Sequence, residues 1–174
     1  MELDVRNRID RNLKGLFGFA VALTSDEDRA RDLVQDAVVK ALQASNVPPD
    51  DRAFRVWLFK ILKNVFIDQM RRDRVDFMDP DEIEIVAGDD GWTEDRQITV
   101  LAVRSAFAEL SRPHRNVLAL VDVAGMSYGE VAEVLNVPQG TVMSRVARAR
   151  ARLMDEMQQD NVTLFPNLSK RARN

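Results

Sequence analysis

The stretch GTVMSRVARARARL, from Gly140 to Leu153, carries four arginines and no acid in a chain of net charge −3. At about 100° per residue, one narrow helical stripe collects apolar residues spaced for packing on a core: Val142, Val146, Ala149 and Leu153. A separate face collects polar and basic side chains: Thr141, Ser144, Arg145, Arg148 and Arg152. Arg150 lies on the other flank, beside Met143. This pattern favours a helix that enters a DNA major groove, with a solvated basic face as the alternative.

The residues before this stretch predict a helix-turn-helix. Ser127 and Glu130 have the spacing of a capping box, which starts a short helix with Val131, Ala132 and Leu135 placed for burial. The segment Asn136-Val137-Pro138 then predicts a tight turn. Upstream, Ser111 and Pro113 indicate another helix start. Three such helices can bury one small core, and a plain three-helix bundle with an arginine-rich surface is the alternative.

Composition sets the class of protein. The chain has 174 residues, of which 45% are hydrophobic, so it can fold as one domain or two small ones without cross-links. It has no cysteine, which excludes disulfides, thiolate metal sites and a cysteine nucleophile. The segment MELDVRNRID lacks the apolar core of a signal peptide, and no run approaches the roughly 18 apolar residues of a membrane span. The thiol-free composition together with these missing apolar segments favours a cytoplasmic protein. Long helical periodicities without alternating strands predict the all-α class.

Acidic residues gather between Asp76 and Asp95, where nine acids and no base occur. Pro80, Gly88 and Gly91 in the same segment predict a flexible acidic linker between two small helical domains. The expected organisation is an N-terminal domain over 1–75, a linker over 76–96, a helix-turn-helix domain over 97–155 and a tail over 156–174. Both domains contain a basic helix, which favours two contacts on one polyanion, although separate solvated surfaces are the alternative.

Two helices of the N-terminal domain carry informative faces. The first begins near Thr24, with Ser25 and Asp28 spaced as a capping box. Its predicted buried face comprises Leu33, Ala37, Val38, Ala41 and Leu42, and its outward face presents Asp32, Gln35, Asp36 and Lys40. The second runs from about Phe54 to Arg72. Its predicted core side comprises Trp57, Leu58, Ile61, Leu62 and Val65, opposite Lys60, Lys63, Asn64 and Arg71. Between the helices, SNVPPDDR predicts a turn-rich loop because its prolines and aspartates disfavour a helix.

The chain resembles an extracytoplasmic-function sigma factor of the sigma-70 family from Leu13 to about Leu153. Four linked segments carry the resemblance, in the right order and spacing: DLVQDAVVKAL, WLFKILKNVFIDQMRR, the acidic linker and MSYGEVAEVLNVPQGTVMSRVARARARL. The resemblance implies a two-domain promoter-specificity subunit of bacterial RNA polymerase. Its implied partners are core RNA polymerase, promoter DNA and an anti-sigma factor.

The resemblance also assigns three binding surfaces. The DLVQD helix would dock on core polymerase through Asp32, Leu33, Gln35 and Asp36. The WLFKILKN helix and the loop before it would bind and melt the −10 element, with a flipped base held by the protein, through Arg52, Arg55, Lys60, Lys63, Asn64, Arg71 and Arg72. The helix-turn-helix would read the −35 element through Thr141, Ser144, Arg145, Arg148 and Arg152. Met143 stands where family members commonly have a basic or polar residue, so a base contact there would be missing or apolar.

Two other classes compete with this interpretation. A sigma-mimic domain that sequesters an anti-sigma factor should lose the basic residues of both DNA surfaces, and this chain keeps them. A plain helix-turn-helix regulator would not need the DLVQD and WLFKILKN segments. An enzyme is least expected, because His114 is the only histidine and the sequence has no metal cluster or phosphate-binding loop. We therefore assign no catalytic residue, cofactor or metal site.

Overall fold

The structure is a computed structural model that describes residues 2–73 and 102–164, with side chains described for 4–73 and 102–158. Every secondary-structure element within these ranges is helical, which confirms the all-α prediction. In chain order the helices are α1 (Glu2–Thr24), α2 (Glu27–Gln43), α3 (Asp51–Asp73), a helix over 102–108, α5 (Arg112–Leu118), the π-helix η1 (Ala119–Val123), α6 (Tyr128–Leu135) and α7 (Gln139–Leu164). The predicted acidic linker over 76–96 and residues 165–174 of the predicted tail lie outside the described residues.

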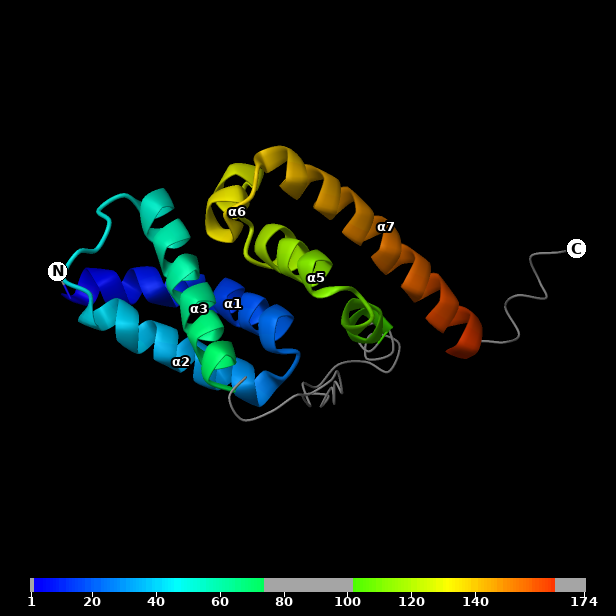
Figure 1. Cartoon of the computed structure of the whole chain (residues 1–174), viewed down its shortest axis with the longest axis horizontal. Helices are drawn as coiled ribbons and strands as arrows, with labels where there is room; N and C mark the ends of the chain where they lie inside the picture. Colours follow the sequence, from blue (N-terminus) through cyan, green and yellow to red (C-terminus); the bar gives the residue numbers. More distant parts are fainter. Residues whose placement is uncertain (1, 74–101, 165–174) are drawn as a thin grey trace, which may run out of the picture.

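Helices α1, α2 and α3 pack together as one three-helix unit, coloured blue to green in Figure 1. Its fully buried large side chains include Leu16, Phe19, Leu33, Leu58, Phe59 and Leu62. The rings of Phe19 and Phe59 stack with their centroids 6.1 Å apart and so join α1 to α3. Trp57 packs at the edge of this core, 5.4 Å from the Phe54 ring, which agrees with its predicted place on the apolar stripe.

The helix starts in this unit differ from two sequence predictions. The capping box of Ser25 and Asp28 is wrong, because α1 runs on to Thr24 and Ser25 reverses the chain with a φ of 58°. Asp26 caps α2 instead, and its carboxylate accepts a hydrogen bond from the Arg29 backbone N–H at 2.7 Å. Helix α3 begins at Asp51, three residues before the predicted start, because Asp50 accepts from the Ala53 N–H in the same way.

Helices α5, η1, α6 and α7 form the second unit. The predicted capping box is confirmed, since Ser127 and Glu130 satisfy each other's backbone N–H groups at the start of α6. Asn136 then ends α6 in the left-handed conformation, with a φ of 55°. The predicted buried stripe of α7 is also confirmed: Val142, Val146 and Ala149 are fully buried, and Leu153 packs against the same core.

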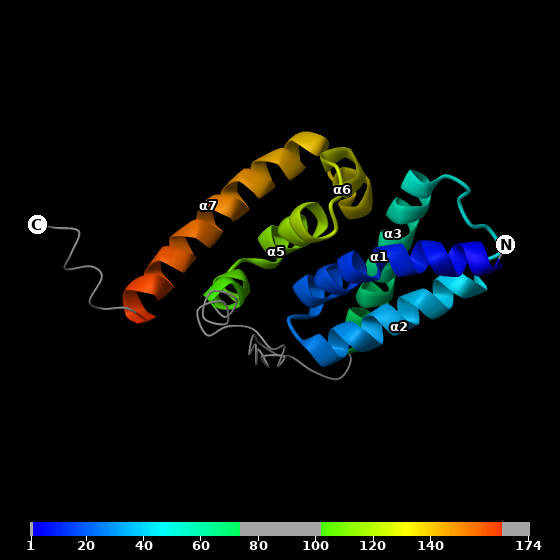
Figure 2. The same ribbon diagram turned by 180° about the vertical axis from the view of Figure 1, so that it is seen from behind.

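The two units pack directly against each other. Figures 1 and 2 show the C-terminal half of α1 beside α5 and the N-terminal half of α3 beside α6. Two glycines permit the close approach of α1. A Cβ atom at Gly15 would lie 2.8 Å from the Ala124 Cβ, and one at Gly18 would lie 2.7 Å from the Val123 Cγ1. Glycine inside a helix is destabilising by roughly 0.5–1 kcal/mol relative to alanine. The two glycines therefore lower the helical stability of α1, and they allow the second unit to pack closely against it.

Candidate DNA and polymerase interface

The predicted polymerase surface lies on α2. Asp32, Gln35 and Asp36 are exposed there, and Asp36 accepts a hydrogen bond from the Gln69 side chain at 3.0 Å. Leu33 is different, because it is 0% exposed and sits in the core shared by the three helices. This burial confirms the predicted place of Leu33 on the buried face, and it corrects the direct contact with polymerase that the resemblance implied. Leu33 holds the helix on the core while its neighbours face outward.

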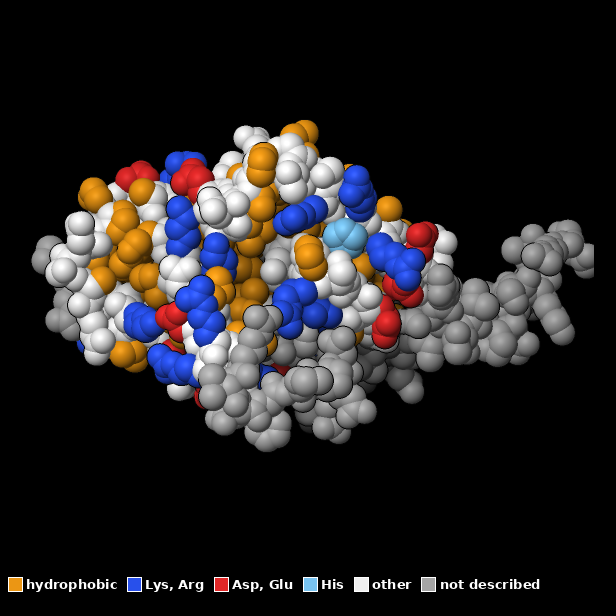
Figure 3. Space-filling view, viewed as in Figure 1, with side chains coloured by type: hydrophobic (Ala, Val, Ile, Leu, Met, Phe, Trp, Pro, Cys, Tyr) orange, Lys and Arg blue, Asp and Glu red, His pale blue; other side chains and the backbone are white. Residues whose placement is uncertain are grey.

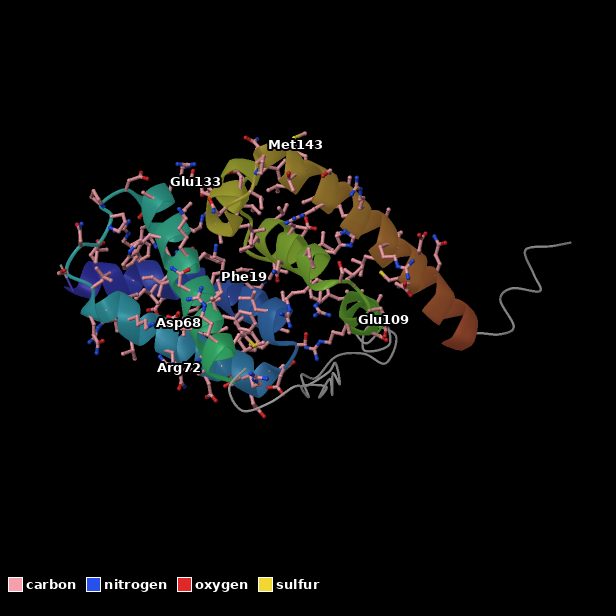
Figure 4. The ribbon with its side chains drawn as sticks, viewed as in Figure 1. Phe19, Asp68, Arg72, Glu109, Glu133 and Met143 are labelled. Atoms are coloured by element: carbon pink, nitrogen blue, oxygen red, sulfur yellow. The ribbon has the colours of Figure 1, made fainter. Side chains whose placement is uncertain are left out.

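The predicted −10 surface follows α3, and its C-terminal part is open. Asn64, Arg71 and Arg72 are exposed and Lys60 is half-buried. None of these four side chains makes a hydrogen bond or ion pair with another described residue. Figure 4 shows Arg72 near the C-terminal end of α3, away from the second unit. This part of the helix is therefore a row of available polar and cationic groups.

The N-terminal part of the same surface contacts α6. Arg55 directs two nitrogens at the Glu130 carboxylate, with Nη2 2.8 Å and Nε 3.2 Å from Oε1. Arg52 pairs with Glu133, which Figure 4 shows on α6 facing the start of α3. Lys63 donates to the Val134 carbonyl oxygen at 2.6 Å. Three of the seven predicted −10 residues thus already have partners.

Burial and hydrogen bonding in this contact shift the pKa values of Glu130 and Lys63. Glu130 is only 3% exposed, and burial alone would raise the pKa of its carboxyl group. Hydrogen bonds from Arg55 and from the Ser127 backbone and hydroxyl outweigh burial, so the pKa of Glu130 lies below its ordinary value. Burial lowers the pKa of the Lys63 ammonium, and the nearby charge of Lys60 lowers it further. The hydrogen bond to Val134 gives this partly desolvated ammonium a fixed acceptor.

The loop before α3 is held by Arg8, a residue that the sequence patterns did not single out. Its guanidinium donates to the backbone carbonyls of Pro48 and Asp50 at 3.0 and 2.9 Å, and it pairs with Asp51 at 2.8 Å. It also stacks over the Phe54 ring, 4.0 Å from the centroid. The sequence does contain a signal for a buried role of Arg8, because this arginine lies on the stripe of α1 that also carries Val5 and Ile9.

A polar cavity of about 370 Å³ lies between α1 and the start of α3. Its lining combines four arginines with a few other groups: Arg8, Arg11, Asn12, Asp51, Arg52, Phe54 and Arg55. The cavity therefore joins the fixed loop to the two arginines that reach α6.

The predicted −35 surface lies at the start of α7. Ser144 and Arg148 are exposed, Thr141 and Arg145 are half-buried, and neither arginine is paired with an acid among the described residues. Met143 is 52% exposed and points outward at the top of the molecule in Figure 4. Figure 3 shows Lys and Arg side chains gathered over α3, α5 and α7 on this face.

Two arginines of α7 pair with acids: Arg150, and Arg152, which belongs to the predicted −35 surface. Arg150 donates to Asp122 of η1 at 2.6 Å, on the flank away from the predicted DNA face. Arg152 pairs with Glu156 one turn further along the helix, at 2.7 Å. The helix therefore divides its arginines between structural pairs and an outward face, as its sequence phase predicts for Arg150.

Family comparisons agree with this architecture. The model described as Sigma-70 region 2 matches residues 8–75, and the model described as Sigma-70, region 4 matches residues 101–153. The ECF RNA polymerase sigma factor EcfG of Rhodopseudomonas palustris is 32% identical over 86% of this chain and 82% of its own length. The sigma factor SigL of Mycobacterium tuberculosis is 31% identical over 91% of this chain and 92% of its own.

Solved structures give the same result. The sigma factor RpoE, solved in complex with the anti-sigma factor NepR from Bartonella quintana, superposes with a TM-score of 0.69 at 31% identity, over 90% of this chain and 95% of that one. CnrH, solved in complex with the cytosolic domain of CnrY, gives a TM-score of 0.65 at 27% identity, over 92% and 91% of the two chains. The chain therefore belongs to the ECF sigma factors of the sigma-70 family.

This family consists of transcription initiation factors rather than enzymes. Within the described ranges, no helix is both long and apolar enough to cross a membrane. The same ranges hold no group of three or more histidine or acidic side chains arranged to bind a metal ion.

Proposed function

We propose that this chain directs bacterial RNA polymerase to its promoters, reading the −35 element with α7 and binding and melting the −10 element with α3. The observation that carries the proposal is the division of arginines on α7. Arg145 and Arg148 stand outward without an acidic partner among the described residues, whereas Arg150 is held by Asp122. The arginines of α7 that have no acidic partner among the described residues therefore lie on the face that a groove would contact.

At the −35 element, the chemistry of α7 suits the major groove. A guanidinium can bind the O6 and N7 acceptors of guanine with two hydrogen bonds, which Arg145 and Arg148 would supply. The hydroxyls of Thr141 and Ser144 would bind phosphates or base edges, and Arg152 a phosphate. Met143 offers an apolar surface, which suits a thymine methyl group better than a polar base edge.

At the −10 element, the proposed melting needs no covalent bond to be made or broken. It needs the single strand to bind more tightly than the duplex, and a protein supplies this bias by holding an unstacked base and its phosphates. Lys60, Arg71 and Arg72 would hold phosphates, and Asn64 can both donate to and accept from a base edge. The loop fixed by Arg8 would take the flipped base, next to the cavity lined by Arg52 and Arg55.

The exposed acids of α2 supply the proposed contact with polymerase. Asp32, Gln35 and Asp36 face outward on a helix whose reverse side is fixed by Leu33. The domain organisation follows from the same proposal: polymerase and −10 binding over 1–75, a tether over 76–96, and −35 binding over 97–155.

Control by an anti-sigma factor completes the proposal. Two structural neighbours support it, because RpoE was solved with the anti-sigma factor NepR and CnrH with the cytosolic domain of CnrY. A sigma-mimic that only sequesters an anti-sigma factor is the competing function. The retained cations on α3 and α7 favour a chain that itself binds DNA.

Run-off transcription with purified core polymerase tests the proposed function. We expect the chain to start transcripts from a subset of promoters in a genomic library, and core polymerase alone to start none of them. Absence of promoter-specific transcripts, together with tight binding of an anti-sigma factor, would instead identify a mimic. A pull-down from the native cell supplies the partner for that second measurement.

A further inference from the structure

An apolar cavity of about 460 Å³ lies between the C-terminal end of α1, the helix over 102–108 and η1. Figures 1 and 2 show the first two of these elements side by side. The volume is within the roughly 300–1,000 Å³ that pockets for small ligands have. None of its apolar side chains belongs to the surfaces assigned above to DNA or polymerase. Six of them line it: Phe17, Val21, Val103, Phe107, Ala119 and Val123.

The side chains around this cavity leave its space unfilled. Gly18 has no side chain to extend into it, and Ala108 and Ala119 have only a methyl group each. Val103 and Val123 are 37% and 47% exposed although both belong to its wall. Apolar atoms that border an empty space lose the dispersion contacts that a close-packed core provides. A ligand with an apolar body would restore those contacts and remove the two valines from water.

Ser25 supplies a polar group at the edge of the cavity. It is half-buried, and its hydroxyl makes no hydrogen bond with another described residue. Its φ of 58° is a conformation that glycine adopts at lower cost than serine. Residues held in such a conformation cluster where ligands are bound. The serine therefore gives up local stability and keeps a hydroxyl that can both donate and accept.

The charged side chains that line the cavity are balanced and have partners. Asp26 caps α2, and Glu27 lies 3.9 Å from Arg104. Arg115 donates to two backbone carbonyl oxygens. With two acids and two arginines in the wall, an ionic head group would meet no net opposite charge, and it would lose hydration on entering an apolar space. The cavity therefore suits an uncharged polar group.

From the volume, the lining and the charge balance we propose that this cavity binds a small uncharged amphiphile. The apolar body of the ligand packs against Phe17, Phe107 and the valines, and its hydroxyl or amide group hydrogen-bonds to Ser25. The proposal goes beyond promoter recognition and does not depend on it. Because the ligand contacts α1 on one side and η1 on the other, binding should stabilise the folded chain.

Three straight-chain probes of equal length test the class of ligand: 1-octanol, octanoate and octylammonium. Calorimetric titration of the full-length chain at pH 7 should show octanol binding at least about tenfold more tightly than either ion, because an ionic head group resists transfer from water. Methyl NMR locates the probe. Octanol should shift the signals of Val103 and Val123, whereas Val39, which is exposed on α2 outside the cavity, should not move.

Ser25→Gly separates ligand binding from folding. The change relieves the left-handed conformation, so the free energy of unfolding without ligand should rise or stay unchanged. Octanol affinity should nevertheless fall by about threefold to tenfold, the loss that one hydrogen bond predicts. Ser25→Ala also removes the hydroxyl but keeps the strained conformation. Its affinity should fall equally, while its stability should not rise.

A cavity-filling variant tests the position of the site. Ala108→Phe adds a ring at a half-buried position in the wall and should weaken octanol binding by at least about tenfold, because the ring occupies the space. Ala151→Phe adds the same ring at an exposed position of α7 that does not line the cavity. This control should bind octanol as wild type does.

Absence of saturable octanol binding by the wild-type chain would overturn the proposal, and so would tighter binding of either ionic probe. Unchanged octanol affinity in both Ala108→Phe and Ser25→Gly would place the probe elsewhere and remove this cavity as the site. Circular dichroism checks that each variant is folded. If Ala108→Phe does not fold, the pair of Ser25 variants decides the outcome, since Ser25→Gly is expected to keep the stability of the chain.

Discussion

Arg8 shows how one side chain of α1 can hold the loop that precedes α3. Its carbonyl contacts to Pro48 and Asp50 fix the segment before α3, and the Phe54 ring supports the guanidinium from one side. Replacing Arg8 with Met keeps the apolar stem and removes every hydrogen bond. We expect the free energy of unfolding to fall by about 2–4 kcal/mol, because hydrogen bonds to a charged group are lost from a buried site.

Urea unfolding of the Arg8→Met chain measures this loss. The matched control is Arg11→Met, since Arg11 is exposed and reaches the same Asp51 at 3.7 Å. An exposed pair of this kind contributes about 0–1 kcal/mol. Equal destabilisation by the two variants would show that Arg8 has no special role in holding the loop.

Glu130 leads to a prediction about pH. Its pKa is lower in the folded chain than in the unfolded one, so its stabilisation is complete above the ordinary glutamate pKa of about 4.3. As the pH falls through the lowered pKa, the folded carboxylate takes up a proton and the stabilisation is lost. Glu130→Gln should therefore be less stable than wild type at pH 7, by roughly 1.5–3 kcal/mol.

Thermal unfolding of both chains between about pH 3 and pH 7 checks the sign of this effect. The gap between them should narrow toward the acid end, because the wild-type side chain becomes neutral there too. A gap that grew on acidification would mean that the carboxylate is not stabilised by Arg55 and Ser127.

At the scale of the element, α2 has a buried face and an exposed face, and the exposed face is the proposed polymerase surface. Asp32→Lys with Asp36→Lys should weaken binding to core polymerase by at least about tenfold. The change replaces two negative charges with two positive ones on the proposed polymerase surface, so attraction would become repulsion. Circular dichroism should show unchanged helicity because both positions are exposed. Asp10→Lys with Glu109→Lys reverses two exposed acids that lie outside α2 and provides the control. Equal polymerase affinity in the two double variants would remove α2 from the interface.

Helix α7 gives the corresponding test for DNA. Arg145→Ala or Arg148→Ala should cost about 1–3 kcal/mol of discrimination between matched and scrambled −35 sequences. Arg152→Ala should weaken binding to both sequences and lower the salt slope by about one. Arg150→Ala should change DNA binding least, because Asp122 holds that guanidinium on the flank away from the proposed DNA face, whereas Arg152 lies on that face. Promoter affinity of the holoenzyme at several salt concentrations measures all four, and the reverse ranking would mean that a different face enters the groove.

At the scale of the whole molecule, the sequence predicts the buried face of a helix, but it does not predict which distant residues meet. The buried stripe of Val142, Val146 and Ala149 was predictable because a helix repeats its faces at a fixed period. The Ser25 capping box failed because residue spacing does not reveal which of several polar residues, here Asp26, the chain presents to the helix. The contact of Arg55 with Glu130 joins residues 75 positions apart, and neither local sequence specifies its partner.

The candidate surfaces also divide into those that helical periodicity predicts and those that depend on contacts between the two units. The exposed rows on α2 and α7 follow from periodicity, so the outward positions of Asp32, Asp36 and Arg148 could be predicted. Periodicity also shows that Leu33 belongs to the apolar stripe, and the family motif alone suggested a direct contact for it. The partial cover over α3 depends on how two units meet, which no pattern within either unit encodes.

The π-helix η1 has a consequence for the evolution of this chain. Its wide turn, in which the Ala124 N–H bonds to the Ala119 oxygen, holds one residue more than an α-helical turn would. The same turn places Ala124 against Gly15 and Val123 against Gly18. In a homologue that lacks the extra residue, Val123 and Ala124 would no longer reach α1. The two glycines would then face a gap, where larger side chains would be favoured. Homologues with a one-residue deletion in η1 should therefore have lost these glycines, and the two changes should be inherited together.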